Sequence, residues 1–200
     1  MTDVAERRYH HGNLREALLD RAAAIVAERG AADLSLREIA RDVGVSHAAP
    51  RRHFPDRQAL LDALALHGFE RLGAELAAAA RAGGRSAFRT RLRRCAAAYV
   101  RFATQDAALL ELMFAGKHRE PDGPLHDAAD AAFATVVAVI AAGQEAGELR
   151  PGDPAEAAMV LFATLQGLAS MLTGGMLDGT TPEAAVRTSV DALLDGLRPR

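Results

Sequence analysis

Four basic side chains, Arg51, Arg52, His53 and Arg57, fall within seven residues, and Asp56 is the one acidic residue among them. Arginine guanidinium groups hold phosphate oxygens through paired N–H donors, so a group of this kind could bind a phosphate backbone. A solvated charged face is the simpler alternative. The residues that precede the group bear on the choice between the two.

The preceding span, 35–54, predicts a helix-turn-helix. Ser35 and Glu38 are spaced as a capping box that opens a short helix, because each side chain can satisfy a backbone N–H group of the first turn. Gly44 predicts a left-handed turn at the end of that helix, and Ser46 is placed to cap a second one. A hairpin without a nucleic-acid role is the alternative. The basic group after the turn favours a helix that enters a DNA major groove.

The whole chain is predicted to be all-α. Alanine, the strongest helix former, occupies 45 of the 200 positions, and apolar residues recur at helical spacing. Capping residues, prolines and glycines divide the chain into about nine helices. Their approximate ranges are 14–30, 36–44, 46–54, 56–81, 86–105, 107–115, 124–146, 154–173 and 182–197.

Composition excludes several classes of protein. One cysteine, Cys95, can form neither an intramolecular disulfide nor a thiolate zinc cluster. No run of about 18 consecutive apolar residues predicts a membrane span, and the first residues lack the apolar core of a signal peptide, so we expect a cytoplasmic protein. The net charge of −2 combines a slightly basic N-terminal part with an acidic remainder. Residues 1–57 carry 10 basic and 9 acidic side chains, whereas residues 58–200 carry 14 and 17.

Four motifs in fixed order give the N-terminal part a resemblance to a known family. They are Tyr9–Arg15, Ser35–Ala40, Gly44–Ser46 and Arg52–Leu61. Residues 9–64 resemble the DNA-binding domain of the TetR family of bacterial transcriptional regulators, and the Tyr-His-His-Gly-Asn start and the Ser-His-Ala-Ala-Pro segment resemble one subgroup of it. The resemblance implies that residues 65–200 form an effector-binding and dimerisation domain.

The resemblance also implies which residues contact DNA. The recognition helix would lie at 46–53, with small alanines facing thymine methyl groups and arginines on phosphates. Arg51 stands where relatives usually carry an aromatic residue, and Arg57 where they usually carry lysine. The implied DNA-binding residues are Ser35, Arg37, Ser46, His47, Ala48, Ala49, Arg51, Arg52, His53 and Arg57. The partner would be a double-stranded, palindromic operator, bound by a homodimer.

In the C-terminal part, the last two helices resemble the pair that forms the dimer interface of this family. Their apolar faces comprise Val160, Leu161, Leu165, Leu168 and Leu172, with Val186, Val190, Leu193, Leu194 and Leu197. Burial inside one subunit is the alternative. An effector pocket would lie between the middle helices and take an apolar small molecule. Its candidates, for which core packing is the alternative, are Tyr99, Phe102, Met113, Phe114, Phe133, Val137, Phe162 and Gln166.

Other chemistry has weaker support. His10 and His11, with His47 or His53, lack the spacing of a metal site, so no metal or cofactor is predicted, and no catalytic constellation is found. Cys95 follows two arginines and could sense redox state, although a buried, inert thiol is the alternative. We therefore expect a ligand-responsive repressor. A helical enzyme and a helical binding module without operator recognition remain as alternatives.

Overall fold

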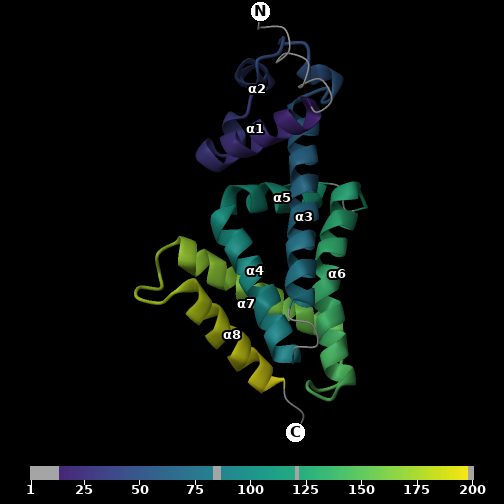
Figure 1. The fold of residues 1–200 in the computed structure, drawn as a ribbon, viewed down its shortest axis with the longest axis vertical. Coiled ribbons are helices and arrows are strands. Elements are labelled where there is room, and N and C mark those ends of the chain that lie inside the picture. The colour runs from purple at the N-terminus through teal and green to yellow at the C-terminus, as the bar shows by residue number, and fades with distance from the viewer. Residues whose placement is uncertain (1–13, 83–86, 120–121, 198–200) are drawn as a thin grey trace, which may run out of the picture.

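The longest helix, α3 (Arg57–Arg81), connects the two ends of the molecule in the computed structural model, which describes residues 14–82, 87–119 and 122–197. Its 25 residues span about 37 Å at the helical rise. The first two helices, α1 (Leu14–Arg29) and α2 (Leu36–Val43), lie at one end of it (Figure 1).

The larger part of the fold surrounds the other end of α3. Among the described residues there are eight α-helices and no strand, which confirms the predicted all-α class. α6 runs beside α3, α4 and α7 cross, and α8 lies on the outside of α4 and α7 (Figure 1). The bounds are α4 (Phe88–Gln105), α5 (Ala107–Arg119), α6 (Pro124–Glu145), α7 (Pro154–Thr173) and α8 (Pro182–Gly196).

Local sequence signals begin three of these helices, α3, α7 and α8, where they were expected. Asp56 caps α3, and its Oδ1 accepts a hydrogen bond from the Ala59 amide at 2.8 Å. Asp153 caps α7 and Thr181 caps α8, each followed by a proline in the first turn. Such caps satisfy amide groups that have no partner inside the helix. The cap predicted at Asn13, like the Tyr9–Asn13 motif, lies outside the described residues.

The prediction of an α-helix at 46–54 is wrong. The chain forms turns there, followed by one short 3-10 helix, η3 (Pro50–Arg52). Pro50 has no N–H group to donate to the Ser46 carbonyl, which accepts instead from Ala49 at 2.9 Å. This three-residue spacing belongs to a 3-10 turn, and eight α-helices are therefore found instead of about nine. A second 3-10 helix, η2 (Ala31–Asp33), was not predicted.

The predicted capping box does not form either. Ser35 is the N-cap residue of α2, but its side chain makes no capping hydrogen bond. Glu38 turns instead to Arg29 of α1, whose Nη2 lies 2.7 Å from Glu38 Oε1. The ion pair links α1 to α2, a contact that local sequence spacing does not reveal.

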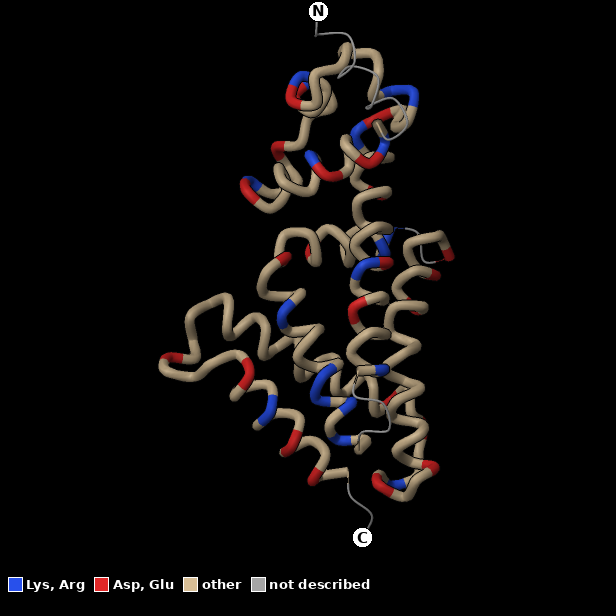
Figure 2. Tube along the Cα trace, in the orientation of Figure 1, with Lys and Arg blue, Asp and Glu red and all other residues tan. Residues whose placement is uncertain are grey.

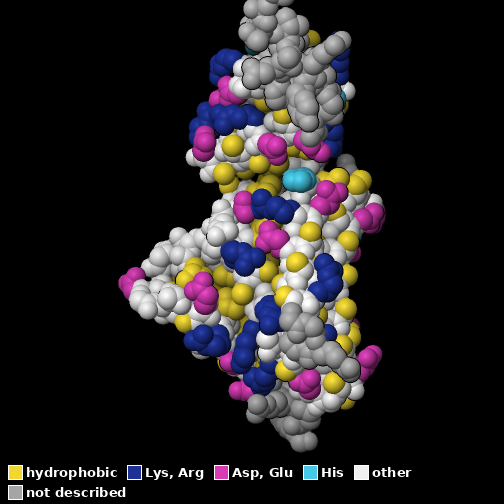
Figure 3. All heavy atoms as spheres, in the orientation of Figure 1, with side chains coloured by type: hydrophobic (Ala, Val, Ile, Leu, Met, Phe, Trp, Pro, Cys, Tyr) yellow, Lys and Arg dark blue, Asp and Glu magenta, His cyan; other side chains and the backbone are white. Residues whose placement is uncertain are grey.

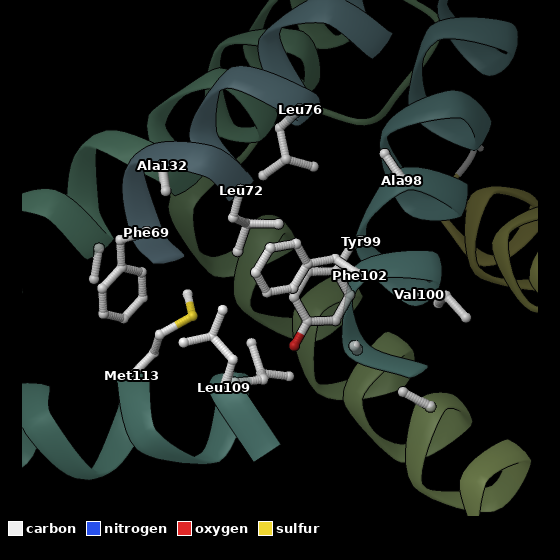
Figure 4. Packing of buried hydrophobic residues seen from close by; sticks show 14 of the residues in the cluster. Phe69, Leu72, Leu76, Ala98, Tyr99, Val100, Phe102, Leu109, Met113 and Ala132 are labelled. Atoms are coloured by element: carbon white, nitrogen blue, oxygen red, sulfur yellow. The ribbon is translucent and has the colours of Figure 1, made fainter. Parts of the chain in front are cut away.

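The core of the larger part is dense where α3 meets its neighbours. Figure 4 shows Phe69, Leu72 and Leu76 of α3 facing Tyr99 and Phe102 of α4 and Met113 of α5. Small residues set the close approaches. A Cβ atom added to Gly68 would lie 2.6 Å from the Met113 sulfur, and one at Gly73 3.2 Å from the Ala132 Cα atom of α6. Larger side chains at these glycines would separate the helices.

Two helices, α6 and α7, are long and apolar enough to cross a membrane by length and hydropathy alone. Both pack within the helical bundle here, α6 against α3 and α7 against α4 and α6. Only 22% of the apolar window of α7 is buried within the chain, so much of its apolar surface is open.

Candidate nucleic-acid interface and effector cavity

The turn after α2 has the geometry predicted from Gly44. Its φ and ψ angles of 76° and 30° lie in the left-handed region, where glycine avoids the steric cost of a Cβ atom. The Val45 amide donates to the Ala40 carbonyl at 2.9 Å, and the Gly44 amide to the Arg41 carbonyl at 3.1 Å. This pair of bonds is a Schellman motif, which ends α2 and turns the chain toward residues 46–54.

The segment after the turn is anchored by two apolar residues. Pro50 and Phe54 are buried, and the Arg15 guanidinium lies 5.6 Å from the centre of the Phe54 ring. The residues between and before them face outward. His47, Ala48, Arg51, Arg52 and His53 are exposed, as is Ser46, whereas Ala49 is half-buried. Although no α-helix forms here, the segment presents the side chains that were predicted to contact DNA.

An open depression brings together predicted residues from three parts of the sequence. It has a volume of about 360 Å³ and is lined by Ser35, Arg37, Arg51 and Arg57, with apolar neighbours and Asp56. Arg37, Arg51 and Arg57 therefore line one depression, and guanidinium groups carry N–H donors suited to phosphate oxygens. The remaining predicted residues lie outside its lining.

Besides lining the depression, Arg57 forms hydrogen bonds that stabilise the fold. Its Nε donates to the Leu34 carbonyl at 3.0 Å, and its Nη2 to the carbonyls of Ala31 and Ala32 at 2.5 and 3.2 Å. These carbonyls belong to the connection between α1 and α2. Arg57 therefore fixes the position of α2, and hence of the turn, relative to α3.

Two acidic side chains of α2, Asp42 and Glu38, form ion pairs with arginines of α1. Asp42 accepts from Arg21 Nε at 2.8 Å, and this hydrogen bond holds the pKa of Asp42 below its usual value. Glu38 is paired with Arg29, as described above. No ion pair joins Arg37, Arg51 or Arg52 to another described residue, so their charges are available at the surface. Figure 2 marks the positions of basic and acidic residues along the backbone at this end of the molecule.

A cavity of about 250 Å³ lies in the larger part, between α4, α5, α6 and α7. Five predicted residues line it: Tyr99, Phe114, Phe133, Val137 and Phe162. The Phe162 ring packs edge to face against two of the others, with centroids 5.1 Å from Phe133 and 5.5 Å from Tyr99. The other lining residues are mainly aliphatic, as expected from the scarcity of aromatic residues, and Cys95 and Lys117 complete the walls.

Three predicted pocket residues do not line this cavity. Phe102 and Met113 are buried in the core, with exposed fractions of 1% and 0%. Gln166 borders a neighbouring surface recess, and its Oε1 accepts a hydrogen bond from the Tyr99 hydroxyl at 2.5 Å. Burial raises the pKa of Tyr99, which keeps this hydroxyl protonated and able to donate.

The sequence reasoning missed two lining residues with polar groups, Lys117 and Cys95. Lys117 is the single lysine of the chain, but its place in a cavity wall depends on tertiary packing. Cys95 is buried, its Sγ lies 3.8 Å from the Leu76 carbonyl oxygen, and burial raises its pKa to about 11. The thiol is therefore the inert form and not a reactive thiolate.

The apolar faces assigned to a dimer interface are mostly internal. Leu161, Leu165 and Leu168 of α7 are buried within the subunit, as are Val190 and Leu194 of α8 together with Val186. They pack where α7 and α8 cover α4. Val160 of the predicted face is 48% exposed, and Met159 and Met171, which were not part of that prediction, are 62% and 39% exposed. Figure 3 shows other apolar side chains in the recess between α8 and the body of the molecule.

No group of three or more histidine, cysteine, aspartate or glutamate side chains in the described ranges could hold a metal ion. His10 and His11 lie outside those ranges.

Comparison with known proteins gives two family matches and many related structures. Residues 18–64 match the bacterial regulatory proteins of the tetR family, and residues 92–197 match the tetracyclin repressor-like C-terminal domain. A comparison with curated proteins found no match.

A solved structure of a protein with unknown function from Rhodococcus sp. RHA1 is 43% identical, with a TM-score of 0.89 over 96% of this chain and 100% of that one. The TetR family transcriptional regulator PfmR from Thermus thermophilus is 24% identical, with a TM-score of 0.69 over 91% of this chain and 99% of that one. The helix-turn-helix end, the helical body and both family matches show that this chain belongs to the TetR family of bacterial transcriptional regulators.

Proposed function

We propose that the protein is a cytoplasmic, ligand-responsive repressor that binds a palindromic operator as a homodimer. The observation that carries this proposal is the exposed segment after the Gly44 turn, with Arg37 and Arg51 beside one open depression. We assign DNA binding to residues 9–64 and effector binding and dimerisation to residues 65–200. We also place the chain in the subgroup with the Tyr-His-His-Gly-Asn start.

The DNA contacts divide into two kinds. Arg37, Arg51 and Arg52 bind phosphates, because their guanidinium groups are exposed and have no acidic partner among the described residues. Ser35, Ser46, His53 and Arg57 support these contacts at the edges of the interface. His47, Ala48 and Ala49 face base edges, where the alanine methyl groups can meet thymine methyl groups.

Dimerisation is supported by the surface of α7. Met159, Ala163, Gly167 and Met171 recur every four residues on one exposed face, and an apolar stripe of this kind is typical of a helix that packs against another subunit. A two-fold axis near α7 and α8 would place the DNA-binding domains of two subunits on the two half-sites of an operator. The interface we propose therefore uses the exposed face of α7 in place of the buried leucines.

Operator binding tests the proposal. DNA fragments selected from the genome by the purified protein should share a palindromic site, and anisotropy titrations should show affinity that falls with salt. Arg51→Ala and Arg52→Ala should each weaken binding to all sequences and reduce the salt slope by about one. Arg81→Ala, an exposed position at the far end of α3, is the control. Absence of any preferred site at moderate salt would contradict the proposal.

A further inference from the structure

We propose that the cavity between α4, α5, α6 and α7 binds a small amphipathic monoanion, whose carboxylate pairs with Lys117 and whose apolar body fills the aromatic end. The proposal rests on the assignment of this region as the effector domain, and it names the class of effector. At the packing density of protein interiors, a cavity of about 250 Å³ holds a ligand of about a dozen non-hydrogen atoms.

The cavity has a single charged side chain among its described lining residues. Lys117 lies in the last turn of α5, and its side chain is 25% exposed, so the aliphatic stem is covered while the ammonium group stays near the opening. The other described walls are alanine, leucine, valine, methionine and aromatic side chains, with the Cys95 thiol, which is neutral at ordinary pH. No described acidic residue lines the cavity. The electrostatic field inside therefore favours an anion over a neutral or cationic ligand.

The present partner of Lys117 is weakly placed to hold it. Its Nζ lies 3.3 Å from Asp130 Oδ1, and the Asp130 side chain is 64% exposed. The other oxygen of Asp130, Oδ2, lies 3.4 Å from His126 Nε2. An exposed ion pair of this kind contributes little stability, so a ligand carboxylate in the less solvated cavity can replace Asp130.

The remaining polar group of the cavity is already satisfied. The Tyr99 hydroxyl donates to Gln166 Oε1, so its proton is not available to an incoming ligand. Lys117 is consequently the group that can orient a ligand, with the carboxylate at α5 and the apolar body between Phe133 and Phe162.

The position of Lys117 also connects the ligand to the DNA-binding end. Two residues later, Arg119 forms an ion pair with Asp62 of α3. α5 also contacts α1 and η2. A ligand that draws Lys117 inward therefore acts on α5, and α5 contacts both α3 and the DNA-binding end of the molecule, through α1 and η2.

Direct ligand binding without DNA tests this inference separately from the repressor proposal. Calorimetric titrations would compare two acids, decanoate and naphthoate, with their neutral counterparts, decanol and naphthalenemethanol. At least one acid should bind roughly threefold to tenfold more tightly than its alcohol, the range of a partly solvated ion pair. Lys117→Met should abolish this preference, and Lys117→Arg should retain it. Asp130→Asn should tighten acid binding, because it removes the competing carboxylate.

Arg41→Met, on α2 and remote from the cavity, removes one positive charge and should leave acid binding unchanged. The inference is overturned if no acid binds at millimolar concentration, if the alcohols bind equally well, or if the preference survives Lys117→Met. Thermal melting identifies a variant that fails to fold, and Asp130→Asn then decides the outcome with the native lysine in place. If the protein binds the acids but does not bind any operator, the repressor proposal alone is contradicted.

Discussion

The hydroxyl group of Tyr99 on α4 donates a hydrogen bond of 2.5 Å to Gln166 Oε1 on α7. Tyr99 is 2% exposed, so its hydroxyl has little access to water and depends on this one partner. The bond fixes the crossing of α4 and α7 between the cavity and the neighbouring surface recess. Gln166, which was predicted to line the effector pocket, thus joins two helices of the fold.

Gln166→Leu should lower the free energy of unfolding by about 1–3 kcal/mol, because it leaves the buried Tyr99 hydroxyl without an acceptor. Tyr99→Phe should cost less, since the half-buried Gln166 can still reach water. The double variant should recover much of the loss. Denaturant unfolding at one fixed protein concentration measures this cycle, and a coupling energy of zero would show that the bond does not join the two helices.

Arg57→Ala should destabilise the DNA-binding end by about 1 kcal/mol, because three carbonyls between α1 and α2 lose their donor. Arg52→Ala is the matched control, since its exposed side chain makes no contact with a described acid. It should leave stability within about 0.5 kcal/mol of wild type while it weakens DNA binding. Hydrogen exchange of the α2 amides reports the local effect. Equal protection in the two variants would refute the structural role of Arg57.

Gly167→Leu tests the dimer face of α7. A Cβ atom at this position meets nothing within 4 Å in one subunit, so the folded monomer tolerates the larger side chain. A closely packed partner helix would not, and the dimer dissociation constant should rise at least about tenfold. Sedimentation equilibrium measures it. Ala134→Leu, on the exposed side of α6, is the control and should leave the dimer intact. An unchanged dissociation constant for Gly167→Leu would place the interface elsewhere.

Cys95 should resist thiol reagents in the native protein at neutral pH and react once the chain unfolds, because the thiol is buried and its pKa is raised to about 11. A raised pKa stabilises the fold below the ordinary thiol value of 9.0, and this contribution is lost as the pH rises through about 11. Cys95→Ala should remove that part of the pH dependence of unfolding. Rapid alkylation of the native protein would contradict the burial.

The sequence by itself determined the features that depend on neighbouring residues. Asp56, Asp153 and Thr181 begin their helices where predicted, because a cap and the amide it satisfies lie within three residues of each other. Gly44 likewise fixes its own turn through its backbone conformation. The family resemblance also depended on short local motifs, and both family matches confirm the family.

The tertiary structure decided which of several available partners each side chain takes. Glu38 could have closed a capping box but pairs with Arg29, and Arg57 finds carbonyls that lie more than 20 residues away. The leucines of α7 and its exposed methionines have the same helical periodicity and similar hydrophobicity, so only the packing of α4 and α8 shows which face is internal. Lys117 gains its place in the cavity in the same way, because a cavity wall is assembled from separate helices.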